Sequence, residues 1–246
     1  MKFIPRVSTP KDDNKCYLKS PKGYNKCIRG NTKNGLNHGK DDVLPNCTGY
    51  AYGRFLEAQE WTSCKLPTCN AEMWLEKNTK YQEGFTARVG SILVFAKGKV
   101  GTGSDGAGHV MFVEDIFKDG TAYCSESGWN FTKSRMDTRK VKRDSKNRYV
   151  YSSKYTYLGC IYPDENFEIG YYGQLPTTTL KYGMKGKEVK RLQDFLNWCM
   201  GSKLSLDGHF GPATRDEVKK YQKKYGLEVD GHFGPACIAK AKTIKF

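Results

Sequence analysis

The stretch PNCTGYAYGRF, Pro45 to Phe55, read together with GHVMFV, Gly108 to Val113, decides how this chain is interpreted. Cys47 stands between a turn-like Pro-Asn pair and an aromatic-rich segment that we expect to form a helix. His109 opens an apolar run that is typical of a strand. A cysteine at a helix start and a histidine on a distant strand are the residue types of a thiol nucleophile and its base. If they meet in space, the sequence predicts a hydrolase.

The composition favours a globular protein. The chain has 246 residues, of which 38% are hydrophobic and 27% charged, so we expect a packed core. No apolar run is long enough to span a bilayer, and membrane insertion is not expected. The opening MKFIPRVSTPKDDNK has no apolar segment of the kind found in secretory signals. We therefore expect synthesis in the cytoplasm, with release by another protein if the chain acts outside.

The net charge of +15 leaves two explanations open. One is a well-solvated, lysine-rich surface; the other is a polyanionic target such as nucleic acid, anionic lipid or a wall that carries acidic polymers. Residues 180–246 hold 14 Lys and Arg against 7 Asp and Glu, a net +7, which leaves +8 for the rest. The sequence has neither a block of like charge nor an RNA-binding aromatic motif, so nucleic acid is the weaker partner class and is not predicted.

The nine cysteines are an odd number, so at least one lies outside any intramolecular disulfide, and reduced thiols are expected. Cys64 and Cys69 have a spacing that occurs in metal sites, but no second Cys/His pair lies nearby and no metal site is predicted. Six other cysteines are expected to be small buried hydrophobic residues: Cys16, Cys27, Cys124, Cys160, Cys199 and Cys237.

A glycine-, proline- and threonine-containing segment divides the chain into two patterns. We predict a first domain over residues 1–165, a linker over 166–178 and a second domain over 179–246. In the first domain, helices are expected at 48–59 and 71–76, before strands at 90–96, 108–117 and 120–127. Helices followed by a run of strands indicate an α+β fold, with helices packed on an antiparallel sheet.

The second domain contains an internal repeat. DGHFGPA occurs at Asp207–Ala213 and again at Asp230–Ala236. Each copy places a proline where a helix can begin, and proline is well tolerated at the first helical position. Apolar residues recur at helical spacing upstream of the first copy and between the two. A small all-α domain of three short helices is therefore predicted.

The motifs LKYGMKGKEVKRLQDFL, DGHFGPAT and VKKYQKKYGLEVDGHFGPA, taken in this order, closely resemble the peptidoglycan-binding domains of cell-wall hydrolases. The resemblance implies that bacterial peptidoglycan, with or without acidic wall polymers, is the partner of this domain. Its candidate wall-contacting aromatic residues are Trp198, Phe210, Tyr221 and Phe233. The repeated His209 and His232 are expected to be structural or solvent-facing rather than metal ligands.

The motifs PNCTGYAYGR, AEMWLE, GSILVF and GHVMFVEDI occur in the order seen in CHAP domains, the cysteine- and histidine-dependent amidohydrolase/peptidase family. The resemblance covers about Asn37 to Pro163. It implies a papain-like fold and cleavage of amide bonds in peptidoglycan. Cys47 would then be the nucleophile, activated by a helix N-terminus and an imidazolium, and His109 would act as base and then as acid.

Glu126 is the predicted third group, which would orient His109. Lys118-Asp119-Gly120 has the character of a hairpin turn, which would bring the Glu126 region back toward His109. A strict two-residue turn would pair Glu126 with Val113, roughly 13 Å along the strand from His109. We therefore expect a longer loop, or a bulge near Gly128, to change the register. Glu114 and Asp115 are competitors, but they lie nearer the turn and are expected to be solvated.

One departure from the family pattern concerns the groups around this triad. Many members have an asparagine two residues after the acidic group, where this chain has Gly128. Asn130, two residues further on, is the alternative orienting residue. The oxyanion needs prearranged donors, for which we consider the backbone N–H of Cys47 and the side chain of Asn46.

Some relatives bind calcium in a loop before the cysteine. GNTKNGLNHGKDD, residues 30–42, has asparagines and two aspartates but lacks the alternating carboxylates and terminal glutamate of a strong calcium loop. No cofactor is therefore predicted, although calcium stays open as an alternative.

The sequence thus predicts a modular peptidoglycan hydrolase of the phage endolysin or bacterial autolysin kind. The N-acetylmuramoyl-L-alanine amidase activity is favoured over an endopeptidase activity. Release to the wall through a membrane hole made by another protein, a holin, is expected. The alternatives are a zinc amidase, a non-catalytic wall-binding protein and a basic nucleic-acid binder.

Overall fold

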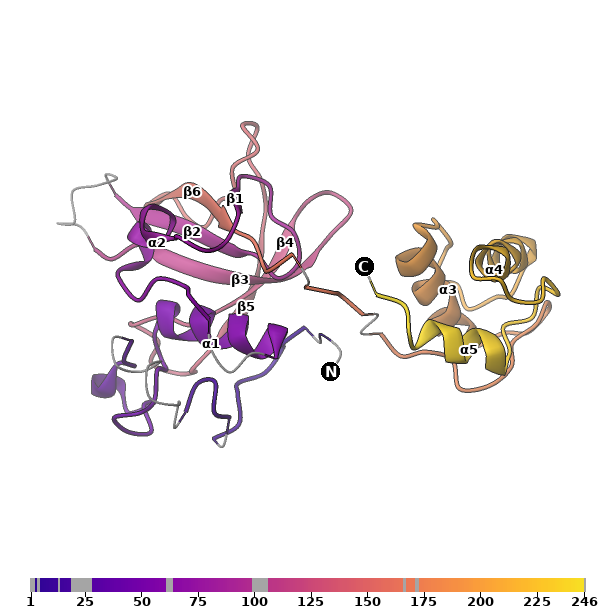
Figure 1. The fold of residues 1–246 in the computed structure, drawn as a ribbon, viewed down its shortest axis with the longest axis horizontal. Helices are drawn as coiled ribbons and strands as arrows, with labels where there is room; N and C mark the ends of the chain where they lie inside the picture. The colour runs from indigo at the N-terminus through magenta and orange to yellow at the C-terminus, as the bar shows by residue number, and fades with distance from the viewer. Residues whose placement is uncertain are drawn as a thin grey trace. The chain divides into compact units, whose positions relative to one another are not determined.

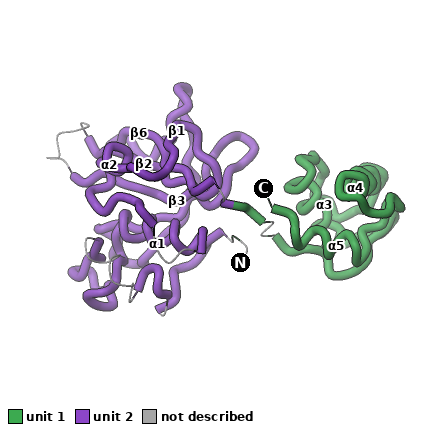
Figure 2. The backbone as a smooth tube through the Cα atoms, in the orientation of Figure 1, with its two compact units in different colours: residues 1–3, 168–246 green, residues 4–167 purple. Residues whose placement is uncertain are grey.

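The computed structural model describes residues 3, 5–12, 14–18, 28–60, 64–98, 106–165, 167–170 and 173–245, so that Cys27 lies outside the described residues. The chain forms two compact units (Figure 2), one of residues 4–167 and one of residues 168–246 together with residues 1–3. The boundary between them falls within the segment 166–178, which the sequence predicts to be a linker.

The first unit is built on a six-stranded antiparallel sheet with the strand order β1-β6-β2-β3-β4-β5 (Figure 1). Its strands are β1 (Glu83–Gly84), β2 (Ile92–Lys97), β3 (His109–Ile116), β4 (Ala122–Glu126), β5 (Asp137–Val141) and β6 (Tyr155–Ile161). The predicted strands correspond to β2, β3 and β4, whose apolar runs are buried on both faces. Strands β1, β5 and β6 are not predicted from the sequence. Strand β1 has only two residues, and β5 is mostly polar.

Helix α1 (Cys47–Gln59) packs against β3 and β4, while η2 (Ala71–Met73) and α2 (Trp74–Lys77) form one continuous helical segment near β2 and β6. The short η1 (Thr32–Asn34) lies in the loop before α1. The face of the sheet away from α1 holds a cluster rich in tyrosine, which includes Tyr149 and Tyr157. The predicted α+β architecture is therefore confirmed. Within the described residues, no helix has the length and apolar character needed to cross a membrane.

Two glycines inside α1 are explained by close packing rather than by helix propensity. A Cβ atom at Gly49 would lie 2.3 Å from the Val43 carbonyl oxygen, and one at Gly53 would lie 2.7 Å from the Cys16 carbonyl oxygen. Glycine weakens a helix interior by about 1 kcal/mol relative to alanine. The residues that precede α1 lie so close to it that a side chain at either position would displace their backbone.

The hairpin between β3 and β4 has a register two residues different from that of a strict two-residue turn. The loop contains three residues, because the Phe117 amide donates to the Thr121 carbonyl. A β-bulge at Glu114 then shifts the pairing again, so that Val113 lies opposite Cys124. Continuing this register places Glu126 opposite Met111, diagonally across from His109. The expected longer loop is therefore present, but the bulge lies in β3 and not near Gly128.

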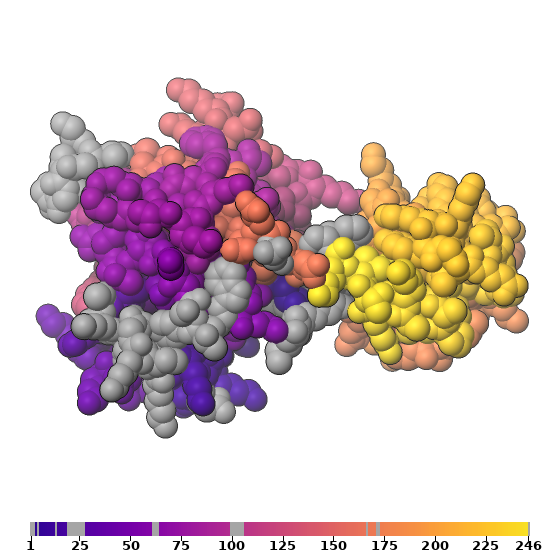
Figure 3. All heavy atoms as spheres, in the orientation of Figure 1, coloured from indigo at the N-terminus to yellow at the C-terminus, as the bar shows by residue number. Residues whose placement is uncertain are grey.

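The second unit contains three helices, α3 (Lys187–Met200), α4 (Pro212–Lys224) and α5 (Pro235–Ala241), which confirms the predicted all-α domain. Pro212 and Pro235 each stand at the start of a helix, as the repeat predicts. In the space-filling view, α4 and α5, coloured gold to yellow, provide much of the visible surface of this unit (Figure 3).

The repeated DGHFGPA turns are each held by a buried glutamine. The Gln193 side-chain amide donates to Asp207 Oδ1 and to the His209 carbonyl, while its Oε1 accepts from the Gly208 N–H. Gln222 makes the same three hydrogen bonds in the second copy, to Asp230, His232 and Gly231. The sequence repeat is thus a repeated polar support for the turn before each helix, and both histidine side chains stay exposed.

The prediction that four aromatic residues of this domain contact the wall is wrong for three of them. Phe210, Tyr221 and Phe233 are at most 1% exposed and form the centre of the helical core. Trp198 is partly buried and packs against the same core. The reason is the small size of the domain, which needs its large aromatic side chains to bury enough apolar surface for stability.

Candidate active site

Cys47 is the first residue of α1, and the sequence before it caps this helix. Asn46 has extended backbone angles, and its Oδ1 accepts hydrogen bonds from the Gly49 N–H and the Thr48 hydroxyl. The Asn46 N–H donates to Ser127 Oγ, which ties the turn to the end of β4. A thiol at this position lies at the positive end of the helix dipole, which favours its thiolate form.

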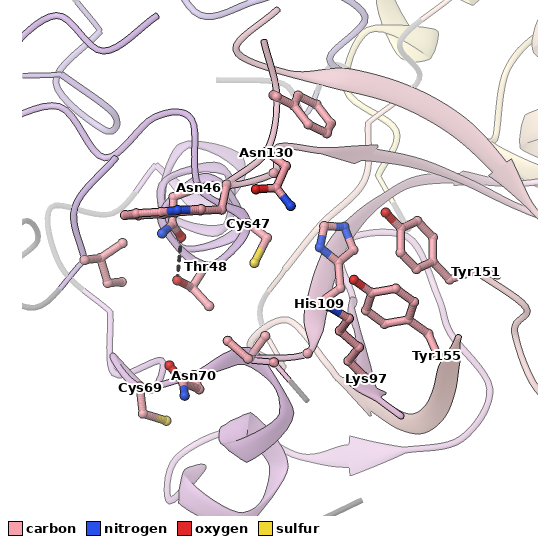
Figure 4. Close-up of a pocket in the computed structure, with 18 of the residues that line it drawn as sticks. Asn46, Cys47, Thr48, Cys69, Asn70, Lys97, His109, Asn130, Tyr151 and Tyr155 are labelled. Atoms are coloured by element: carbon pink, nitrogen blue, oxygen red, sulfur yellow. Dashed lines mark hydrogen bonds between the residues drawn. The ribbon is translucent and has the colours of Figure 1, made fainter. Parts of the chain in front are cut away.

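Asn46 is therefore occupied as a cap. Besides the two bonds that its Oδ1 accepts, its Nδ2 donates to the Arg29 carbonyl. Both ends of this amide have partners, which argues against the expected role of Asn46 as an oxyanion donor. Asn130 belongs to the same cleft and lies beside the Cys47–His109 pair (Figure 4).

His109 and Glu126 lie together at the end of the sheet, as the corrected register requires. His109 Nε2 lies 2.5 Å from Glu126 Oε2, and the Glu126 carboxylate is completely buried. Because Glu126 occupies Nε2, the other ring nitrogen, Nδ1, is left for the thiol. The Cys47 side chain points toward the His109 ring in Figure 4. The structure thus brings together the three residues that the sequence singles out.

Two residues that the sequence analysis missed complete this arrangement. Arg139 on β5 forms an ion pair through its Nε with Glu126 Oε1. The Tyr151 ring stacks on the His109 ring, with centroids 4.7 Å apart and planes at 11°, and the Arg139 guanidinium lies over the same tyrosine ring at 4.7 Å. Tyr151 therefore contacts both groups that bind Glu126. The sequence signal for Arg139 is weak, because DTRKV has the appearance of an exposed segment.

The electrostatic surroundings favour a protonated His109. Burial lowers the pKa of this imidazole, but hydrogen bonds and charge interactions with Cys47 and Glu126 outweigh burial and raise the pKa to about 9. Away from this histidine, burial raises the pKa of the Cys16 thiol and that of the Cys64 thiol to about 11. An imidazolium beside a thiol at a helix start is the arrangement that activates a cysteine nucleophile.

The cleft around the pair has a volume of about 660 Å³. Its walls combine the start of α1, the segment 106–109 before and at the start of β3, the residues after β4, and tyrosines near β6. Cys69 and Asn70 also line it, on the side away from His109 (Figure 4). The volume is within the range that holds a small ligand or a peptide segment.

Glu114, considered as a competitor for Glu126, has a different environment from the expected one. It is completely buried rather than solvated, and both of its oxygens accept from the Arg54 guanidinium at 2.8 Å. It also accepts from the Ser125 hydroxyl and the Arg6 N–H. Glu114 shares the strand face of Phe112, and α1 covers this face with Arg54. Asp115 stays partly exposed.

The candidate metal-binding residues either pair with other protein groups or have no further metal-ligating side chains grouped with them among the described residues. Asp42, in the segment considered for calcium, accepts from the Leu44 N–H and forms an ion pair with Arg135 Nη2 at 2.6 Å. Among the residues that the structure describes, no three His, Cys, Asp or Glu side chains are grouped so that they could hold one ion. Cys64 and Cys69 therefore lack further ligands within this part of the chain.

Comparison with known families agrees with this geometry. Residues 37–128 match the CHAP domain, and residues 185–240 match the putative peptidoglycan binding domain. The first match falls in the first compact unit and the second match in the helical unit. No curated protein matches the chain significantly.

Three solved structures are similar to parts of the chain. A Burkholderia AP3 phage endolysin is 36% identical over 27% of this chain and 25% of its own, with a TM-score of 0.26. An N-acetylmuramoyl-L-alanine amidase from Staphylococcus aureus is 25% identical over 47% of this chain and 30% of its own, with a TM-score of 0.34. A Clostridioides difficile peptidoglycan-binding protein is 24% identical over 57% and 62%, with a TM-score of 0.26. The chain thus spans about a quarter of the endolysin.

Proposed function

We propose that this protein is a peptidoglycan hydrolase that cleaves an amide bond through a Cys47 thioester. The observation that carries the proposal is the side-chain hydrogen bond between the helix-start Cys47 and His109, whose other ring nitrogen contacts the buried Glu126 carboxylate. The CHAP and peptidoglycan-binding matches supply the substrate class.

The proposed reaction has two steps. The Cys47 thiolate attacks the amide carbonyl, and the C–N bond breaks as His109 gives its proton to the departing amine. A water molecule, deprotonated by His109, then attacks the thioester carbonyl and releases the acid and the thiol. Glu126 orients the imidazole and stabilises its charge, and Arg139 holds Glu126. The Cys47 N–H and the Asn130 amide are the proposed oxyanion donors.

The second unit would hold the enzyme on its substrate. The four lysines that α4 exposes, Lys219, Lys220, Lys223 and Lys224, agree with a wall that carries acidic polymers. We favour an amidase activity over an endopeptidase activity, and we propose that it needs no cofactor. The protein would act as an endolysin that reaches the wall with the help of a holin. The same catalytic groups serve either bond, so mass spectrometry of the released fragments decides between them.

The test compares two cysteines of one cleft. We expect Cys47→Ala to abolish the lysis of purified walls while the protein still binds to them. Cys69→Ala is the matched control and should lyse walls normally, because Cys69 lies away from His109 (Figure 4). Lysis by the Cys47→Ala protein would refute the thioester mechanism. Loss of wall binding by that variant would instead show that its fold had changed, which a thermal melt of both proteins detects.

A further inference from the structure

Lys97 and Tyr155 face each other on two neighbouring strands close to His109. The pairing of β2 with β6 places Lys97 directly opposite Tyr155, and directly opposed side chains lie on the same face of a sheet. Two residues earlier in β2, Phe95 lies opposite His109. The side chains of Lys97 and Tyr155 therefore lie on the same face of the sheet as His109, about 7 Å away from it along the strand direction.

Both side chains line the cleft that holds the proposed nucleophile (Figure 4). The Tyr155 ring meets the His109 ring edge-on, with centroids 6.2 Å apart, so it belongs to the immediate surroundings of the imidazole. Lys97 is half-buried. Among the described residues that line the cleft there is no aspartate or glutamate, whereas Arg29 and Lys97 are both present. The described lining therefore carries cationic side chains and no carboxylate.

The polar atoms of the pair have no side-chain partner among the residues that the structure describes. Within the part of the chain that the structure describes, Lys97 Nζ has no carboxylate within ion-pair distance, and the Tyr155 hydroxyl has no hydrogen-bond partner. Burial, with the nearby Cys47 and Glu126, raises the pKa of Tyr155, so its hydroxyl stays a neutral donor. Tyr151 differs from Tyr155 because its ring already contacts both His109 and Arg139.

We propose that Lys97 and Tyr155 form a carboxylate-binding subsite, so that the preferred substrate is a peptide with a free carboxylate close to the scissile amide. An ammonium group and a hydroxyl together match the two oxygens of a carboxylate, and hydrogen bonds to a charged group are the stronger kind. The distance of about 7 Å from His109 corresponds to one or two residues of an extended peptide. This inference rests on the proposed hydrolase function and adds the chemical class of its substrate.

The experiment uses two preparations of the same purified walls. One is native, and in the other the carboxylates are converted to amides by carbodiimide coupling with ammonia. Initial rates are divided by the amount of bound enzyme, because amidation also changes the charge that the second unit meets. We expect the full-length protein to cleave the native walls about tenfold faster per bound molecule, the effect of one charged hydrogen bond.

Three variants locate the effect. Lys97→Met should lower the rate on native walls about tenfold and remove the preference, and Tyr155→Phe should do so more weakly. Lys154→Met removes the same charge from an exposed lysine outside the cleft lining and should behave as the unmodified protein. Since the comparison of the two walls needs no variant, it stands even if Lys97→Met fails to fold.

The outcomes separate this inference from the proposed function. Equal cleavage of both preparations by the unmodified protein would overturn the subsite and leave the hydrolase proposal intact. A Lys97→Met protein that keeps the full preference would overturn it as well. Cleavage of neither preparation would instead contradict the hydrolase function itself.

Discussion

Glu114→Gln tests whether the buried ion pair beneath α1 stabilises the first unit. The carboxylate is fully buried, and the Arg54 side chain that it binds is 4% exposed. The substitution leaves the Arg54 charge without its bidentate partner. Breaking a buried pair by removing one member costs about 3–5 kcal/mol. Glu57 still contacts Arg54 Nη1 at 2.8 Å, so we expect the lower end, about 3 kcal/mol.

Differential scanning calorimetry of the full chain measures this change. In a unit of this size, 1 kcal/mol shifts the melting temperature by about 2–4 °C, so Glu114→Gln should lower the transition of the first unit by about 6–12 °C. The transition of the helical unit should not move. Glu57→Gln is the matched control and should cost about 1 kcal/mol, because Glu57 is 22% exposed. A loss below about 1 kcal/mol for Glu114→Gln would refute the reasoning.

Three further predictions concern the active site and the helical unit. Because the pKa of His109 is raised to about 9, wall cleavage should fall as the pH rises through that value. The stability that the His109 charge contributes is complete below about pH 6.5 and should be lost as the pH rises through 9. Cleavage rates and thermal melts from pH 6 to 10 measure the two changes. Arg139→Met removes a partner of Glu126 and should lower kcat about tenfold with little change in KM, which steady-state kinetics measure. Phe195→Ala should destabilise the helical unit by about 3–5 kcal/mol and reduce wall retention in a pull-down, while the alkylation of Cys47 stays unchanged.

The sequence predicts the structure correctly where neighbouring residues alone determine it. The sequence places Cys47 at a helix start because a turn-like Pro-Asn pair precedes it and an aromatic-rich segment follows it. In the structure, Asn46 is the cap of this helix. The repeated Gly-Pro pairs likewise predicted the starts of α4 and α5. In both cases the signal involves only neighbouring residues.

The sequence does not predict the features of the site and core that depend on contacts between residues far apart in the chain. A bulge of one residue in β3 brings Glu126 within reach of His109, and no local sequence pattern predicts this bulge. Arg139 reaches Glu126 from a polar strand that was not predicted. Phe210, Tyr221 and Phe233 are predicted to contact the wall, whereas the small domain needs them in its core.

The most direct test of the proposed thiolate–imidazolium pair is the rate at which iodoacetamide alkylates each cysteine at pH 6, followed by mass spectrometry of the peptides. Burial raises the pKa of Cys69, the other thiol of the cleft, so Cys69 should react slowly. We expect Cys47 to react more than about tenfold faster than Cys69, wall lysis to be lost in step with its alkylation, and the advantage to disappear in His109→Ala. Equal rates for Cys47 and Cys69, or full lysis after Cys47 is alkylated, would contradict the account.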